Sequence, residues 1–180
     1  MIVVIGASAS GKTEIAKILT NKFKIDKCIT TTTRLKRPNE VNHIDYHFID
    51  KKSFLNLIKK GKFVEHAIYN NNYYGINKDD VKTNSIVIVE PNGANSLIKV
   101  YSEKTYIVYV KSLESVRKSR MLKRGDDVID VNTRIESDKL VFRKENINRI
   151  DLVISNNHFC SLDSLAKKIY KKYQKFLEKK

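Results

Sequence analysis

A glycine-rich loop close to the N-terminus constrains this chain more than any other feature of its sequence. The residues before it, Ile2–Ile5, form a continuous β-branched run, which is typical of a strand buried on both faces. The loop follows the pattern GxxxxGKS/T through Gly6, Ala7, Ser8, Ala9, Ser10, Gly11, Lys12 and Thr13. Ile15, Ile18 and Leu19 then recur at helical spacing, so a helix is expected directly after the loop. Strand, glycine turn and helix in this order predict a phosphate-binding loop.

Each residue type in the loop has a chemical role. Glycines let backbone N–H groups curl around a phosphate, and the N-terminus of the following helix adds positive potential. Lys12 is expected to reach the β- and γ-phosphates, and the Thr13 hydroxyl is expected to ligate Mg²⁺. The sequence therefore predicts that residues 6–13 bind the phosphates of a nucleoside triphosphate.

The order of apolar segments predicts the fold class. Buried-strand patterns recur at Ile86–Val89, Tyr106–Val110 and Leu152–Ile154, with helical patterns between them. The C-terminal segment Leu162–Leu177 has the spacing of an amphipathic helix with lysines on its polar face. Alternation of this kind predicts an α/β fold of the P-loop NTPase type, with a parallel sheet flanked by helices.

The 180 residues suit a single domain with two attached parts. Residues 1–29, 77–119 and 139–180 carry the core patterns. Segment 30–76 is polar, aromatic and rich in turns, which predicts a small mixed α/β insert. Segment 120–138 is strongly charged and nearly devoid of core-forming residues, so we expect it to form a mobile lid.

Composition excludes several other classes. The net charge of +15 would attract any phosphate, but a chain rich in Lys, Asn and Ile would also follow from an A/T-biased genome. Nucleic acid is therefore not an expected partner. The longest apolar runs fall far short of the roughly 20 residues that span a bilayer, so no membrane association is expected. Cys28 and Cys160 are too few for a disulfide framework, which favours a cytoplasmic location.

The insert carries side chains suited to a second nucleotide. Arg34 and Arg37 lie three residues apart, tyrosine hydroxyls follow, and Glu65 is a lone carboxylate after two apolar residues. Arginines and tyrosines suit a phosphate, whereas a carboxylate can accept a pair of N–H bonds from a base. This combination indicates an acceptor site for a nucleoside monophosphate.

The same residues carry a resemblance to the guanylate kinase family that extends over nearly the whole chain. The family shows a TTRxxRxGE stretch, then DYxF, FxE and YG, and this chain has Thr32–Glu40, Asp45–Phe48, Phe63–Glu65 and Tyr74-Gly75 in that order. The resemblance implies that GMP is bound by Thr30, Arg34, Arg37, Tyr46, Glu65, Tyr74 and Glu90. Within that set, Glu65 would pair with guanine N1–H and the 2-amino group. Asn156 falls where the family supports the ATP adenine.

The charged segment 120–138 resembles the family's ATP-closing lid, with arginines at or within one residue of the family's positions. The resemblance implies transfer of a phosphoryl group from MgATP to GMP or dGMP, with Mg²⁺ as cofactor. The residues expected to act in catalysis are Lys12, Arg34, Arg120, Arg124 and Arg134. The protein is expected to be a monomer or a homodimer.

Three departures from the family pattern leave alternatives open. Ile88 stands where the family has the first of two acids, Ile76 replaces a hydroxyl residue, and Asn39 replaces a glycine. A related P-loop kinase with another phosphorylated acceptor is one alternative. A catalytically weak, guanylate kinase-like binding module is the second, although the intact Lys12-Thr13 pair argues against it.

Overall fold

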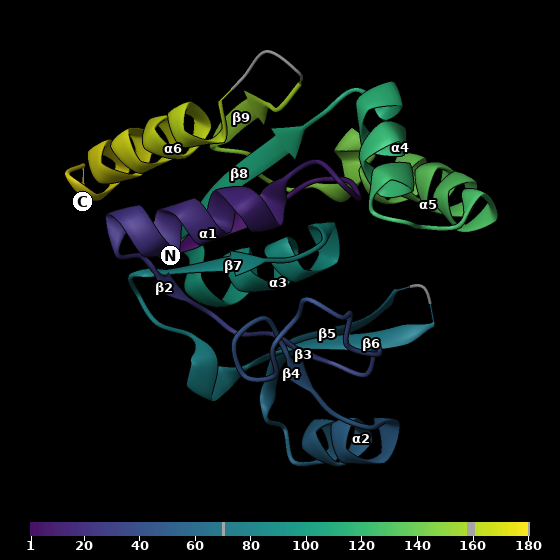
Figure 1. The fold of residues 1–180 in the computed structure, drawn as a ribbon. Helices are drawn as coiled ribbons and strands as arrows, with labels where there is room; N and C mark the ends of the chain where they lie inside the picture. Colours follow the sequence, from purple (N-terminus) through teal and green to yellow (C-terminus); the bar gives the residue numbers. More distant parts are fainter. Residues whose placement is uncertain (70, 158–160, 180) are drawn as a thin grey trace.

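The computed structural model describes residues 1–69, 71–157 and 161–179 (Figure 1). Its first sheet is parallel, five-stranded and ordered β2-β7-β1-β8-β9. The strands are β1 (Ile2–Ile5), β2 (Asp26–Lys27), β7 (Ser85–Ile88), β8 (Tyr106–Lys111) and β9 (Leu152–Ser155). The predicted parallel sheet is confirmed. The two-residue strand β2 has no sequence pattern of its own and was not anticipated.

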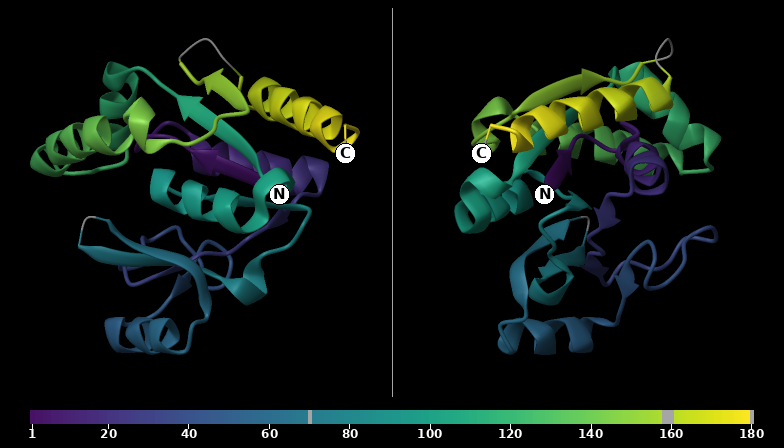
Figure 2. Two further views of the ribbon diagram at one scale, coloured as in Figure 1. Left: turned by 180° about the vertical axis from the view of Figure 1, so that it is seen from behind. Right: turned by 90° about the vertical axis from the view of Figure 1, so that its left-hand side faces the viewer.

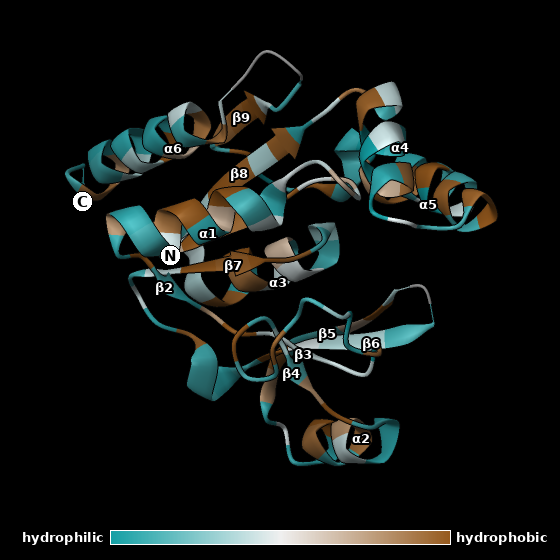
Figure 3. Ribbon diagram, in the orientation of Figure 1, coloured by the Kyte–Doolittle hydropathy of each residue, from teal (hydrophilic) through white to brown (hydrophobic). Residues whose placement is uncertain are grey.

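The central strand β1 is buried on both faces, as its unbroken apolar run predicts. Ile2 and Val4 belong to the core shared with α1 (Lys12–Phe23) and α6 (Leu162–Leu177). Val3 and Ile5 point to the opposite core, where α3 (Pro91–Tyr101) packs. Helices therefore cover both faces of the sheet, and α6 keeps its lysine-rich face outward (Figure 3).

A second sheet lies on the α3 side of the first (Figure 2). Its order is β4-β3-β6-β5, with β3–β4 parallel and the other pairs antiparallel, which confirms a mixed arrangement. Its elements are β3 (Thr31–Thr32), β4 (His47–Phe48), α2 (Lys51–Lys59), β5 (Phe63–Tyr69) and β6 (Asn72–Asn77). Phe54 of α2 packs on Phe63 and Tyr73, so this sheet has an aromatic core of its own.

Two helices after β8 form the α4–α5 hairpin, which comprises α4 (Glu114–Lys123) and α5 (Val128–Val141). Our expectation that this region lacks core-forming residues is wrong. Met121, Val131 and Ile135 are almost fully buried and form a small core against Ala9 of the phosphate loop. The hairpin is thus packed on the loop that it adjoins.

Short connecting elements complete the described chain. They are the 3₁₀ turns η1 (Lys78–Asp80), η2 (Ser102–Lys104) and η3 (Lys144–Asn146). Cys28 is buried and unbonded, whereas Cys160 lies outside the described residues. Among the described residues, no helix is long and apolar enough to cross a membrane.

Candidate active site

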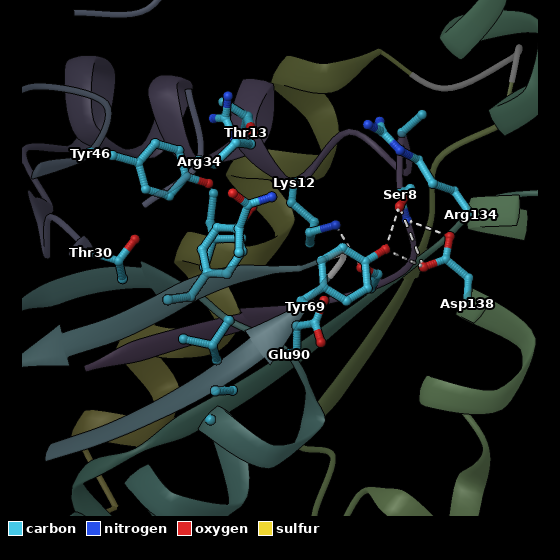
Figure 4. A pocket seen from close by; sticks show the side chains of 18 of the residues that line it. Ser8, Lys12, Thr13, Thr30, Arg34, Tyr46, Tyr69, Glu90, Arg134 and Asp138 are labelled. Carbon is cyan, nitrogen blue, oxygen red and sulfur yellow. Dashed lines mark hydrogen bonds between the residues drawn. The ribbon is translucent and has the colours of Figure 1, made fainter. Parts of the chain in front are cut away.

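One cleft of about 570 Å³ lies where the first sheet, the second sheet and the α4–α5 hairpin meet. Parallel sheets bind ligands beyond the carboxyl ends of their strands, and the loop after β1 opens into this cleft. Figure 4 shows Tyr46 and Thr30 at one end, Lys12 in the middle, and Ser8, Arg134 and Asp138 at the other. The predicted site residues that line the cleft are Gly6, Ser8, Ala9, Lys12, Thr13, Thr30, Arg34, Arg37, Tyr46, Glu65, Tyr74, Glu90, Arg124 and Arg134.

The two glycines that bound the phosphate loop cannot be replaced without steric conflict. Gly6 has φ 152°, and a Cβ there would come within 2.4 Å of the Val110 carbonyl oxygen. Gly11 has φ 96°, and its Cβ would meet the Asn156 side chain at 2.1 Å. The motif glycines therefore allow the loop to pack closely against β8 and the segment after β9.

Lys12 lies inside the loop. Its Nζ donates to the carbonyl oxygens of Gly6 at 2.6 Å and Ala7 at 2.9 Å. Burial lowers the pKa of Lys12 to about 8, although Asp138 and Glu90 act in the opposite direction. The ammonium group is poorly solvated, so an anion entering the loop would gain a strong partner.

The end of the cleft formed by the second sheet presents a fixed arginine. Arg34 donates to both carboxylate oxygens of Glu40, at 2.7 and 2.9 Å, and lies over the rings of Tyr46 and Phe48. Both bonds come from Nη2 while Nη1 donates to the Leu35 carbonyl, and together with the ring contacts these bonds hold the guanidinium in one orientation. Tyr46 lies edge-on to Tyr74, and burial raises the pKa of Tyr46, which keeps its hydroxyl protonated.

A β-bulge sets the position of Glu65. The pairing of β5 with β6 shifts between Phe63 and Glu65, which turns the carboxylate toward α3 and the cleft. A Cβ at Gly93 of α3 would come within 2.9 Å of Glu65 Oε1, so the glycine leaves room for this carboxylate. Burial raises the pKa of Glu65 to about 7, because it removes water from the charged form of the carboxylate.

Two arginines of the α4–α5 hairpin share one carboxylate. Arg124 pairs with Asp126 through Nε at 2.8 Å and also through Nη2, and Arg134 Nη1 donates to the same carboxylate at 3.1 Å. Burial and then the positive charges of Arg34 and Arg124 lower the pKa of Arg37. Guanidinium groups from the second sheet and the hairpin therefore converge on one volume, where a phosphate would balance their charge.

Five predicted residues do not line this cleft: Ala7, Ser10, Gly11, Arg120 and Asn156. Arg120 donates to the carbonyl oxygens of Ala9 at 3.2 Å and Asn156 at 3.2 Å, behind the phosphate loop. Asn156 is buried, and its side-chain amide donates to the Ser10 carbonyl at 2.8 Å. Both residues therefore brace the back of the loop. The Ala7 carbonyl accepts from Lys12 Nζ at 2.9 Å and from the Ser10 N–H at 3.2 Å, so it holds the loop together from within.

Two of the three departures noted in the sequence, Ile76 and Ile88, are apolar parts of the cleft wall, whereas Asn39 is exposed and does not line the cleft. Ile76 is 1% exposed and packs in the core with Val3 and Ile5, and Ile88 lines the cleft beside Glu90. They make this wall less polar than hydroxyl or carboxylate side chains would. The buried surroundings also raise the pKa of Glu90 to about 7.

Several residues of the site were not predicted. Glu40 fixes Arg34, Asp126 joins Arg124 to Arg134, and Asp138 lies beside the phosphate loop, where it accepts from the Ser8 amide. Glu40 belongs to a quoted motif, so its spacing from Arg34 was an available signal. Asp126 and Asp138 follow no motif, and only the packing of the hairpin reveals their partners.

A phosphate loop and a second anion-binding end within one cleft define a P-loop kinase that acts on a nucleoside monophosphate. Comparison with known proteins gives the family. The guanylate kinase family model matches residues 1–180, and the chain belongs to this family.

Individual relatives agree with this membership. A guanylate kinase from Mycoplasma genitalium is 34% identical over 170 residues, covering 88% of this chain and 70% of the relative. One from Wolbachia pipientis is 30% identical over 167 residues, covering 87% and 82%. The crystal structure of guanylate kinase from Anaplasma phagocytophilum shares the fold, with a TM-score of 0.72 at 20% identity and coverage of 97% and 84%.

Proposed function

We infer that this chain transfers the γ-phosphate of ATP to GMP, giving ADP and GDP. The observation that carries this inference is the shared cleft, in which the phosphate loop faces Arg34, Tyr46 and Glu65. Curated guanylate kinases that are 30% and 34% identical over most of the chain support the same reaction and disfavour a binding module.

Alignment and charge neutralisation account for most of the catalysis in this proposal. Phosphoryl transfer needs little covalent chemistry from the protein, because the attacking and leaving oxygens must only be held in line. Lys12 would bind the donor phosphates, and Arg34, Arg37, Tyr46 and Tyr74 would bind the phosphate of GMP. We further propose that residues 30–76 and 120–138 close over the core, which would exclude water from the transfer.

The cleft suits a magnesium ion. The Thr13 hydroxyl and the Glu90 carboxylate both line it, and such oxygen donors are the ligands that Mg²⁺ prefers. We propose that Thr13 holds the ion and that Glu90 supports it. When bound there, Mg²⁺ would neutralise charge on the donor phosphates.

A panel of acceptors tests the function. Coupled ADP release is measured with ATP and each of GMP, dGMP, AMP, CMP and UMP. We expect GMP to give the highest kcat/KM. Preference for a different monophosphate would assign the cleft to another acceptor, and ATP binding without any transfer would favour a binding module.

Arg124→Ala is expected to act mainly on the chemical step. Arg124 contacts Asp126 and lines the cleft on the hairpin side, away from the Glu65 end. Loss of one preorganised cation should lower kcat by about 100-fold and change the KM for GMP only slightly. Arg143→Ala, which removes an exposed arginine outside the cleft, is the matched control. A mutant that changes only the KM for GMP would assign Arg124 to the acceptor site instead.

The pH dependence of GMP use should report Glu65. Its pKa is raised to about 7, so the free enzyme carries a proton there below that pH and has lost an acceptor for guanine N–H groups. We expect kcat/KM for GMP to fall as the pH is lowered from 8 to 6.

Two other groups titrate in the same pH range. The effect of Glu65 is therefore measured as the ratio of wild-type to Glu65→Gln kcat/KM at each pH. A phosphate monoester has a second pKa of about 6, and the pKa of Glu90 is also about 7. Both contributions are present in Glu65→Gln as well as in the wild type. The ratio of wild-type to mutant kcat/KM should therefore rise between pH 6 and 8, and a flat ratio would show that Glu65 does not titrate in GMP capture.

A further inference from the structure

A buried ion pair joins the two helices of the α4–α5 hairpin beside the phosphate loop. Arg117 Nη1 donates to Asp138 Oδ2 at 2.7 Å, and the two side chains are only 7% and 1% exposed. Burying both charges costs desolvation free energy that their mutual attraction need not recover. A buried pair is therefore weak evidence for stability, and its other contacts are the better guide to its role.

Those contacts hold one residue of the phosphate loop. The Ser8 backbone N–H donates to Asp138 Oδ2 at 2.9 Å, and the Ser8 carbonyl lies 3.4 Å from Arg117 Nη1. The ion pair thus contacts the N–H and the C=O of the same loop residue. Because Ser8 lies in the segment that wraps the donor phosphates, the contact fixes backbone groups next to the reacting atoms.

The second sheet reaches the same point through Tyr69 at the end of β5. The Tyr69 hydroxyl lies 3.3 Å from Ser8 Oγ and 3.5 Å from Asp138 Oδ1 (Figure 4). Three parts of the molecule therefore meet in one polar cluster of Ser8, Tyr69, Arg117 and Asp138. We call this cluster the loop junction.

Asp138 also affects the position of Arg134, which lies on the same helix and lines the cleft. Arg134 precedes Asp138 by four residues in α5, so both lie on the same face of the helix. Anchoring Asp138 at Ser8 therefore directs Arg134 over the cleft, where its guanidinium pairs with Asp126.

We propose that Asp138 is a positioning residue for phosphoryl transfer: paired with Arg117, it anchors α5 to the Ser8 amide and so aligns the phosphate loop with Arg134. Tyr69 joins the second sheet to the same anchor. The proposal rests on the proposed function for its kinetic readout, and ATP affinity gives a readout that needs no acceptor.

Removing only one partner would leave an unpaired buried charge, so the variants remove both. Arg117→Met with Asp138→Asn keeps a side-chain oxygen that can accept from Ser8. Arg117→Met with Asp138→Ala removes that acceptor. Neutral replacement of a buried ion pair is commonly tolerated, so both double variants should fold, and thermal unfolding checks this.

The alanine double variant should show about 5- to 10-fold lower kcat with GMP than the asparagine double variant. It should also bind ATP about 5- to 10-fold more weakly, measured by calorimetry without GMP. Equal kcat and equal ATP affinity in the two folded double variants would reduce Asp138 to a structural role. If the wild type transferred nothing to any monophosphate, the proposed function would fail, whereas the ATP affinities would still decide this proposal.

Tyr69→Phe tests whether the second sheet shares the anchor. It should lower kcat/KM for GMP about 2- to 10-fold in the wild-type background and have little effect in the alanine double variant. Tyr73→Phe removes a hydroxyl from the next strand, where the ring packs on Phe54 outside the cleft, and is the matched control. If Tyr69→Phe had the same effect in both backgrounds, Tyr69 would act independently of Asp138, and the second sheet would not share the anchor.

Discussion

Lys12→Ala is expected to lower kcat for transfer from ATP to GMP by about 1000-fold, with the fold intact. The lysine is held inside the loop by the carbonyl oxygens of Gly6 and Ala7, where it can stabilise charge that develops on the donor phosphates. Water cannot replace it, because the site is largely desolvated. Steady-state kinetics with saturating ATP and GMP measure the effect.

Lys12→Ala should not lower the stability of the folded state. Lys12 has a pKa near 8 in the folded protein, below its ordinary value of 10.5, so folding disfavours the ammonium form. That cost is fully present below pH 8 and is lost as the pH rises toward 10.5. At pH 7 the mutant should therefore have a Tm equal to or above that of the wild type.

Lys17→Ala on the same helix is the control, since Lys17 is exposed and pairs only with Glu14 in the described structure. We expect it to keep wild-type kinetics. Turnover of Lys12→Ala close to that of the wild type would contradict the assignment of the loop to ATP.

The sequence predicts those parts of the molecule whose signals are local. The phosphate loop is a contiguous motif between a strand and a helix, and it lies where that order requires. Unbroken apolar runs predict buried strands such as Tyr106–Lys111. Strand β2 has two residues and no such run, so its pairing with β7 depends on tertiary structure.

The α4–α5 hairpin shows why the remaining features escaped prediction. Met121, Val131 and Ile135 are scattered among charged residues, and only the packing of α4 against α5 brings them together into a core. Arg117 and Asp138 are separated by 21 positions in the chain, so no helical spacing relates them. Side chains that act through a distant partner leave no periodic signal, which is why the role of Asp138 could not be predicted from the sequence.

Glu65→Gln should lower kcat/KM for GMP by roughly 30- to 1000-fold, or about 2–4 kcal/mol. A carboxylate can accept N–H bonds from guanine N1 and the 2-amino group through its two oxygens. Glutamine keeps the shape but loses the charge and one acceptor, so an amide N–H₂ would face a guanine donor. Steady-state kinetics with GMP and with AMP measure the effect.

Comparing activity with GMP and with AMP tests whether Glu65 recognises the base. Adenine offers an acceptor at N1 and lacks the 2-amino group, so it cannot make the pair of bonds that Glu65 accepts from guanine. Activity with AMP should fall far less than activity with GMP, and discrimination between the bases should collapse.

Loss of stability can be separated from loss of recognition. Burial raises the pKa of Glu65 to about 7, so the folded state disfavours the carboxylate above the ordinary pKa of 4.5. A neutral glutamine should therefore leave the Tm unchanged or raise it at pH 8. Glu145→Gln, at an exposed position outside the cleft, controls for the general effect of removing a negative charge. A Glu65→Gln enzyme that retains the full preference for GMP over AMP would show that another group reads the base, because no other change in the mutant could restore the lost acceptor.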